Sequence, residues 1–171
     1  MFANRNLKRD LLALIVAALA AFIGISLATY CPTDPVSLET DLERQNVFGA
    51  SGAIISSFLV ANLGLSANFL VAALVCMSFW MLRNEEIQLP VMRSAGFVLT
   101  VAGISAILAL LTPDLIASFN LGSGGRLGHA SGNFLLTQFS LVGAVIVTIF
   151  ALVAGLLMFS DYALLQFTRW G

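Results

Sequence analysis

Residues 11–30 read LLALIVAALAAFIGISLATY, twenty consecutive positions without a charged side chain. About 20 apolar residues in a helix cross the hydrocarbon core of a bilayer, so this run predicts a membrane-spanning helix. The whole chain of 171 residues has the same character, with 59% hydrophobic residues, 10% charged residues and a mean hydropathy of +0.97. A water-soluble fold of this size exposes too much surface to hide so many apolar side chains. Composition therefore predicts an integral membrane protein and excludes a secreted disulfide scaffold, a nucleic-acid-binding domain and a disordered chain.

The positions of the charged residues predict four spans, at about 11–30, 65–82, 94–112 and 139–159. The second and fourth charge-free stretches are too long for one helix and too short for two helices with a loop. We therefore expect a further helix before each of these spans, at about 47–62 and 127–138, lying in the membrane interface or dipping into it. The expected fold is all-α: one integral membrane domain over 1–171, with four transmembrane helices and two interfacial or re-entrant amphipathic helices on the outer side.

Lysine and arginine predict the orientation of these spans. If the N-terminus is cytoplasmic, six basic residues share its side of the membrane: Arg5, Lys8, Arg9, Arg83, Arg93 and Arg169. Only Arg44 and Arg126 fall on the other side. Cytoplasmic loops are enriched in Lys and Arg, so both termini are predicted to be cytoplasmic. An acidic loop then faces outward and is expected to be solvated; it contains Asp34, Glu39, Asp41 and Glu43.

Two segments resemble each other at an offset of 76 residues. Residues 49–59 align with 125–135, with glycine at the first and fourth positions and Phe-Leu at the end of both segments. The spans before them share Gly-Ile-Ser, at 24–26 and 103–105. The pattern predicts an internal two-fold repeat of span, outer loop, interface helix and span. Chance alignment of membrane sequence rich in Gly and Ser is the alternative.

Few residues have a pattern that indicates chemistry. The glycine-rich segment 122–128 carries one Arg, but no Gly-Lys-Ser/Thr follows and no strand precedes it, so we interpret it as a tight turn rather than a phosphate loop. His129 is the only histidine, and no Cys lies near it, so a metal site would have to borrow ligands from another chain. The acidic loop lacks the spacing of a calcium loop. No catalytic residue, cofactor or metal ligand is predicted.

The predicted spans contain no Asp, Glu, Lys, Arg or His. Transporters and proton pumps keep such residues inside the membrane, so their absence from the spans argues against transport. The spans instead carry small residues at four-residue spacing, a pattern that lets helices approach closely. Two series lie in the first span: Ala13, Ala17 and Ala21, and Ala20, Gly24 and Ala28. Packing within one chain and self-assembly both fit these series.

Three motifs stand in order along the chain: YCPTDPVS at 30–37, NVFGASGAIISSFL at 46–59 with a glycine at 64, and GGRLG at 124–128. On a four-span layout they resemble the aspartate-proline-serine signature and the two glycine signatures of the membrane domain of bacterial FtsK/SpoIIIE-type DNA translocases. The resemblance covers roughly residues 10–160. The sequence departs from the family pattern at Ser57, where that family often has an acidic residue. The motif residues are Asp34, Pro35, Asn46, Gly49, Gly52, Gly64, Gly124, Gly125 and Gly128.

The resemblance implies a non-catalytic domain that anchors and assembles a DNA translocase acting in cell division and chromosome segregation. It implies a multi-pass protein of the bacterial inner membrane whose partners are the lipid bilayer, further copies of the chain and septal division proteins. DNA would be reached only through a C-terminal ATP-driven motor, and the 171 residues contain no Walker motif. Two other classes stay open from the residues alone: an accessory subunit of a larger membrane complex, and a small transporter or channel.

Overall fold

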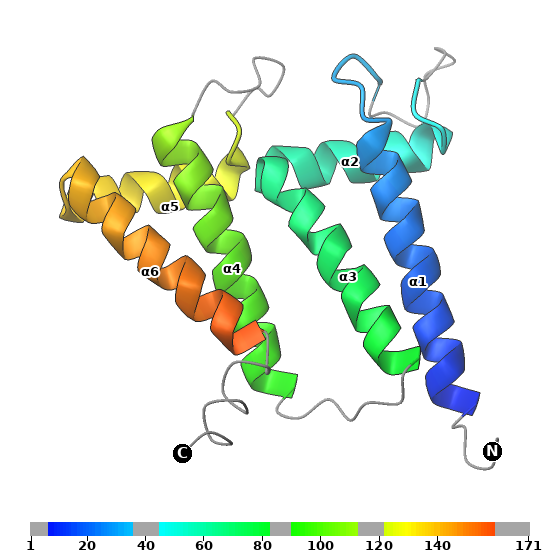
Figure 1. The fold of residues 1–171 in the computed structure, drawn as a ribbon. Helices are drawn as coiled ribbons and strands as arrows, with labels where there is room; N and C mark the ends of the chain where they lie inside the picture. The colour runs from blue at the N-terminus through cyan, green and yellow to red at the C-terminus, as the bar shows by residue number, and fades with distance from the viewer. Residues whose placement is uncertain (1–6, 36–44, 83–89, 113–121, 160–171) are drawn as a thin grey trace, which may run out of the picture. The chain divides into compact units, whose positions relative to one another are not determined.

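The structure, a computed structural model, describes residues 7–35, 45–82, 90–112 and 122–159 (Figure 1). All regular elements in these ranges are helical, which confirms the predicted all-α class. In chain order they are α1 (Leu7–Ala28), α2 (Gly49–Leu63), the short 3-10 helix η1 (Gly64–Ser66), α3 (Ala67–Leu82), α4 (Pro90–Leu111), α5 (Gly125–Gln138) and α6 (Leu141–Phe159).

Within the described residues, four helical segments are long and apolar enough to cross a membrane, as predicted: Arg9–Ala28, Gly49–Phe79, Ser94–Leu111 and Leu141–Phe159. The second segment contains both α2 and α3, which η1 separates. α1 and α4 begin before the predicted starts at residues 11 and 94, because their first turns include charged residues that the sequence analysis assigned to loops. The start of α4 on Pro90 fits proline's preference for the first helical position.

The chain divides into two compact units. The first unit contains residues 1–59 and 68–87, and the second contains residues 60–67 and 88–171. Each unit therefore holds two long helices and one crossing helix, with the end of α2 belonging to the second unit. The single membrane domain expected from the sequence stays a prediction.

In the first unit α1 and α3 pack antiparallel through small and polar side chains. The Ser78 hydroxyl donates a hydrogen bond of 2.9 Å to the carbonyl of Ala13, and Ala13 itself is fully buried. A Cβ at Gly24 would lie 3.1 Å from Cγ1 of Val71, so the helices are also close near the other end of α1. Of the predicted small-residue series, Ala13 and Ala20 are buried, whereas Ala21 is exposed. One face of α1 thus serves packing within the chain.

In the second unit α4 and α6 approach until their backbones nearly touch. A Cβ at Gly155 would lie 2.7 Å from both the nitrogen and Oγ1 of Thr100, and one at Gly96 would lie 2.6 Å from the nitrogen of Phe159. Thr100 is fully buried, and its hydroxyl donates to the carbonyl of Gly96 at 2.8 Å. Glycine at both helices permits this approach, because any larger residue would push the pair apart.

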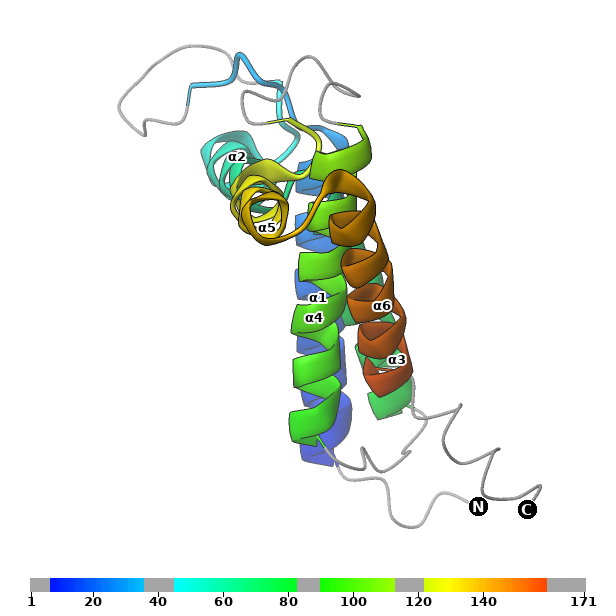
Figure 2. The ribbon, with the colours of Figure 1, turned by 90° about the vertical axis from the view of Figure 1, so that its left-hand side faces the viewer.

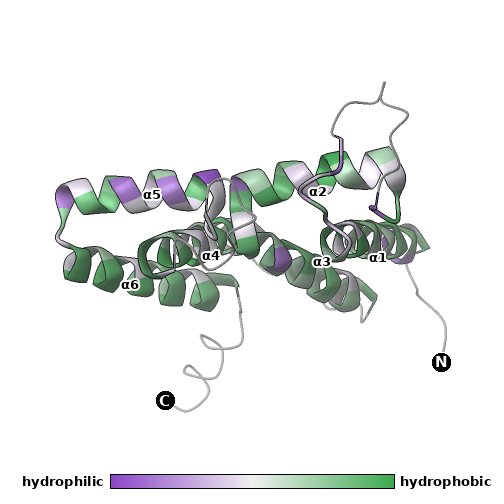
Figure 3. Cartoon of the chain, turned by 90° about the horizontal axis from the view of Figure 1, so that it is seen from above, coloured by the Kyte–Doolittle hydropathy of each residue, from purple (hydrophilic) through white to green (hydrophobic). Residues whose placement is uncertain are grey.

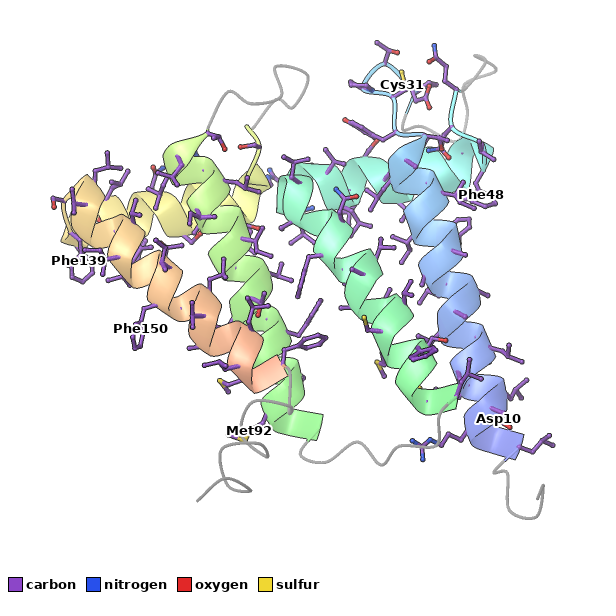
Figure 4. The ribbon with its side chains drawn as sticks, viewed as in Figure 1. Asp10, Cys31, Phe48, Met92, Phe139 and Phe150 are labelled. Carbon is purple, nitrogen blue, oxygen red and sulfur yellow. The ribbon has the colours of Figure 1, made fainter. Side chains whose placement is uncertain are left out.

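The outer surface of α6 is apolar. Val142, Ile146 and Phe150 are exposed, and Figure 4 shows Phe150 pointing away from α4. A soluble protein rarely exposes a continuous apolar surface of this kind, whereas a membrane-spanning helix presents it to lipid. The exposed apolar side chains therefore support the assignment of α6 as a span.

The two crossing helices differ in character. α5 lies across the last turns of α4, and Figures 1 and 2 show the two helices at a steep angle. It buries Gly125, Gly128 and Gly132. Its exposed residues include Arg126, His129 and Asn133, and Figure 3 colours the hydrophilic positions of α5 purple. α2 crosses α1 in the same way, but it carries no charged residue, and its apolar residues are spread around the helix rather than gathered on one face. The predicted amphipathic character fits α5, while α2 is suited to a more apolar setting.

Replacing Gly155 with Ala should destabilise the second unit, because the new Cβ would collide with the Thr100 backbone. We expect a loss of about 1–3 kcal/mol, the usual cost of overpacking. Gly132→Ala is the matched control, since its Cβ would meet Leu110 and Ala109 at ordinary distances of 3.6–3.7 Å. This control should gain about 0.5–1 kcal/mol from the loss of glycine's freedom in the unfolded chain. Thermal unfolding in detergent micelles measures both variants, and equal melting temperatures would contradict the expectation.

Candidate functional site

The first glycine turn, residues 45–52, is fixed by a buried carboxylate. The two oxygens of Asp34 accept hydrogen bonds from the backbone N–H groups of Gln45 and Asn46, both at 3.0 Å. Asp34 is only 6% exposed, so its assignment to a solvated acidic loop is wrong. Glu39, Asp41 and Glu43 of that predicted loop lie outside the described residues.

Asn46 joins the end of α1 to the start of α2. Its Nδ2 donates to the carbonyls of Ser26 and Thr29 at 2.9 and 3.3 Å, and its Oδ1 accepts the N–H of Phe48 at 3.1 Å. Carbonyls in the last turn of a helix lack intrahelical partners, so the amide supplies what the end of α1 needs. The aromatic rings of Phe48 and Phe22 lie beside each other, with centroids 4.6 Å apart, and Figure 4 shows Phe48 near the start of α2.

Glycine is required at two points of this turn for different reasons. Gly49 has φ of +58°, a left-handed conformation that favours glycine. At Gly52, which is buried, a Cβ would overlap Oδ1 of Asn46. The amide of Asn46 can therefore lie against α2 only because residue 52 has no side chain. Pro35, the remaining residue of this motif, is half-buried directly after Asp34.

The second glycine turn, residues 122–128, is held by direct backbone contact. Gly64 and Gly125 have φ of +61° and +62°, and a Cβ at Gly125 would lie 2.6 Å from the nitrogen of Gly64. The N–H of Leu65 donates to the carbonyl of Ser123 at 2.9 Å. Two chain segments meet here with no side chain between them, and this explains glycine at both positions.

Serines complete the second turn. A Cβ at either Gly124 or Gly128 would overlap the carbonyl oxygen of Ser105. The hydroxyls of Ser105 and Ser66 share a hydrogen bond of 2.6 Å. The Ser123 hydroxyl lies within donating distance of two carbonyls at the end of α4, that of Leu108 in its last turn and that of Thr112 directly after it. The capping role of Ser123 was not predicted from the sequence. Its position inside a glycine-rich turn next to a span end was the available signal.

The two turns share a hydrogen-bond pattern at the offset of 76 residues. In each turn the N–H of the first glycine bonds to the carbonyl three residues earlier, and the N–H of the second glycine bonds to the carbonyl four residues earlier. The bonds are Gly49 to Asn46 (2.9 Å) and Gly52 to Phe48 (3.4 Å) in the first turn, and Gly125 to Gly122 (3.2 Å) and Gly128 to Gly124 (3.0 Å) in the second. Gly122 therefore occupies in the second turn the position that Asn46 occupies in the first.

The chemistry of these turns is structural. In the described ranges, no group of three His, Cys, Asp or Glu residues lies close enough together to hold a metal ion. His129 is exposed on α5, where its Nε2 lies 3.1 Å from Nδ2 of Asn133. Burial, and secondly the neighbouring Cys31, raises the pKa of Tyr30 above its ordinary value. The buried polar groups of both turns serve to join helices.

These features define a class: a helical, multi-pass membrane domain whose helix corners are closed by glycine turns. The family described as the 4TM region of DNA translocase FtsK/SpoIIIE matches residues 5–171, and the chain belongs to this family. It is accordingly a multi-pass protein of the inner membrane.

Two curated relatives are named DNA translocase FtsK. The protein of Vibrio vulnificus is 29% identical over 161 residues, covering 88% of this chain, and that of Shewanella oneidensis is 25% identical over 151 residues, covering 83%. In both cases the match spans only 16% of the relative's length. No solved structure matches the chain.

The Asp34 carboxylate can be tested by replacement with asparagine. The amide has one acceptor oxygen, so one of the two N–H groups of Gln45 and Asn46 would face a donor. We expect a loss of about 1–3 kcal/mol, the cost of an unsatisfied buried group, together with faster hydrogen exchange over residues 45–52. Thr33→Ala is the control, because Thr33 is exposed beside the same turn. Unchanged hydrogen exchange over residues 45–52 in the Asp34→Asn variant would show that the Asp34 carboxylate does not hold this turn.

A pair of alanine variants separates backbone conformation from backbone contact. Gly49 and Gly125 have nearly the same positive φ, but a Cβ at Gly49 meets nothing within 4 Å. Gly49→Ala should therefore cost about 1–2 kcal/mol, the strain of the left-handed conformation alone. Gly125→Ala should cost clearly more, because it also separates the turn from Gly64. Unfolding of monomers in detergent provides the comparison, and equal losses would show that the close approach contributes nothing.

Proposed function

We propose that this chain is the membrane-anchoring and assembly domain of a DNA translocase that acts in cell division and chromosome segregation, and that it is itself non-catalytic. Membership of the family described as the 4TM region of DNA translocase FtsK/SpoIIIE carries this proposal. The relatives named DNA translocase FtsK are much longer proteins, of which the matched region is 16%. DNA is then handled by a motor outside this region.

Anchoring is mechanical in this proposal. A motor that moves DNA exerts a reaction force, which its membrane domain must transmit to the bilayer without losing its shape. Contacts between glycine backbones, as at Gly155 and Gly125, are stiff because no flexible side chain lies between the helices. The exposed apolar side chains of α1 and α6 provide the lipid contact. Four such helices resist extraction far better than a single lipid chain would.

Assembly uses the outer side of the membrane. The distribution of Lys and Arg supports cytoplasmic termini, which brings both glycine turns to the outer side. The turns and the loops that precede them then contact septal division proteins and other copies of the chain. The acidic residues Glu39, Asp41 and Glu43 add charge to the first of these loops.

The two halves of the chain, each with a span, a glycine turn, a crossing helix and a second span, derive from one ancestral segment by internal duplication. The offset of 76 residues relates the glycines of both turns, their positive φ and their backbone hydrogen bonds. The partners differ: the first turn binds the carbonyl of Ser26 through Asn46, and the second places Gly124 and Gly128 directly on the carbonyl of Ser105. Both carbonyls belong to the shared Gly-Ile-Ser sequence.

Fluorescent and topological fusions test the proposal in cells. A fluorescent protein that matures only in the cytoplasm, fused to Gly171, should be bright and enriched at the division septum. A reporter active only outside the cell should work when inserted after Glu43 and fail at Gly171. An inactive cytoplasmic fusion at Gly171 would overturn the orientation, and uniform fluorescence around the membrane would overturn the septal role.

A further inference from the structure

The second glycine turn is covered by a helix corner. We call residues 60–67, the end of α2 with η1, the α2–α3 corner; it belongs to the second unit. Its residues Val60, Ser66 and Ala67 are buried, with exposed fractions of 7%, 1% and 0%. On the turn itself, Ser123 and Gly125 are buried as well. The contact is direct, because the Leu65 N–H bonds to the Ser123 carbonyl at 2.9 Å.

The equivalent corner between α5 and α6 is uncovered. Adding the offset of 76 residues gives residues 136–143, the α5–α6 corner, and Figure 4 shows Phe139 at this place. Leu136, the counterpart of Val60, is 44% exposed, and Val142, the counterpart of Ser66, is 69% exposed. The corner thus presents apolar side chains at the positions that are buried in the α2–α3 corner.

The first glycine turn is uncovered in a complementary way. Val47, the counterpart of the fully buried Ser123, is 67% exposed. At Gly125 a Cβ would meet the nitrogen of Gly64 and the carbonyl of Asn62, whereas at Gly49 it meets nothing within 4 Å. The first turn therefore has an open surface where the second turn receives the corner.

We propose that the α5–α6 corner of one chain packs against the first glycine turn of a second copy, and so repeats between chains the contact that the α2–α3 corner makes with the second turn. In this contact the N–H of Leu141 in one chain donates to the carbonyl of Val47 in the other. Within one chain, the N–H of Leu65 donates to the carbonyl of Ser123 in the same way. The proposal rests on the internal duplication of the proposed function and names a partner for its assembly role.

Continuity with the internal contact favours a second copy over another occupant. Lipid tails also cover apolar side chains, but they supply no donor for a backbone carbonyl and no matched surface for an open glycine turn. Within the described residues, each chain carries one uncovered corner and one uncovered turn. The contact is therefore heterologous, and it forms a ring if the rotation between copies closes. The contact between chains has to hold larger residues than the internal one. Ser140 of one chain replaces Gly64, and Phe48 of the other replaces Gly124; the open space at Gly49 provides room for both.

Cysteine cross-linking in native membranes tests the contact. In a Cys31→Ser, Cys76→Ala background, Val47→Cys and Leu141→Cys chains with different affinity tags are co-expressed and treated with a short bis-thiol reagent. We expect a covalent heterodimer carrying both tags. Val47→Cys with Phe150→Cys is the matched control and should give none, because Phe150 is more exposed than Leu141 (78% against 54%) but lies halfway along α6. Leu65→Cys with Ser123→Cys in one chain verifies that the reagent reaches such a corner.

A steric variant provides the second measurement. Val142→Trp should abolish the heterodimer, whereas Ile146→Trp, one turn further along α6 and similarly exposed, should leave it unchanged. The proposal is overturned if the reagent links the internal pair but not the mixed chains. It is also overturned if a single chain that carries both Val47→Cys and Leu141→Cys is linked only within itself. Septal localisation of the Gly171 fusion is read separately, so that loss of the heterodimer with normal localisation refutes this contact and leaves the anchoring function standing.

Discussion

The structure depends on the satisfaction of backbone polar groups at helix ends that lie next to lipid. A helix leaves four N–H groups and four carbonyls without partners, and an apolar solvent cannot supply them. In this protein the ends of α1 and α4 are closed by side chains from the following glycine turn, through Asn46 and Ser123. Each crossing helix is consequently fixed to the span that precedes it.

The two turns meet this constraint with different partners on a shared glycine framework. The first turn relies on side chains, with the Asp34 carboxylate on two backbone N–H groups and the Asn46 amide lying against Gly52. The second relies on the backbone itself, with Gly125 against Gly64 and Gly128 against the Ser105 carbonyl. Both turns need glycine, because another atom occupies the position of the Cβ. At Gly52 this atom is Oδ1 of Asn46, and at Gly125 it is the nitrogen of Gly64. The glycine positions therefore accept fewer substitutions than the residues around them.

Much of this fold is predictable from the sequence, because hydropathy and charge act over whole helices. The four spanning segments and the helices before the second and fourth spans follow from the lengths of the charge-free stretches. The burial of Asp34 could not be predicted in this way. The distribution of charged residues predicts on which side of the membrane a loop lies, but it carries no information on whether one carboxylate accepts hydrogen bonds from two N–H groups. The interpretation of residues 122–128 as a tight turn needed only glycine's tolerance of positive φ, whereas the contact of Gly64 with Gly125 is tertiary and has no local signal.

A duplicated segment whose corner covers the glycine turn of the next segment has an inherent asymmetry. Two duplicated segments make one such contact, and among the described residues one turn and one corner are left without it, as the exposure of Val47 and Val142 indicates. Terminal units of repeat proteins commonly carry a polar capping surface for this reason. Here the uncovered surfaces are apolar and lack that signature of a cap. Within a bilayer, an apolar surface needs no protein partner, because lipid covers it. A position with positive φ strains any residue other than glycine, and at Gly49 no packing contact accompanies this constraint. In the proposed contact, a neighbour that approaches the backbone closely needs glycine at position 49, as Gly64 needs it at Gly125.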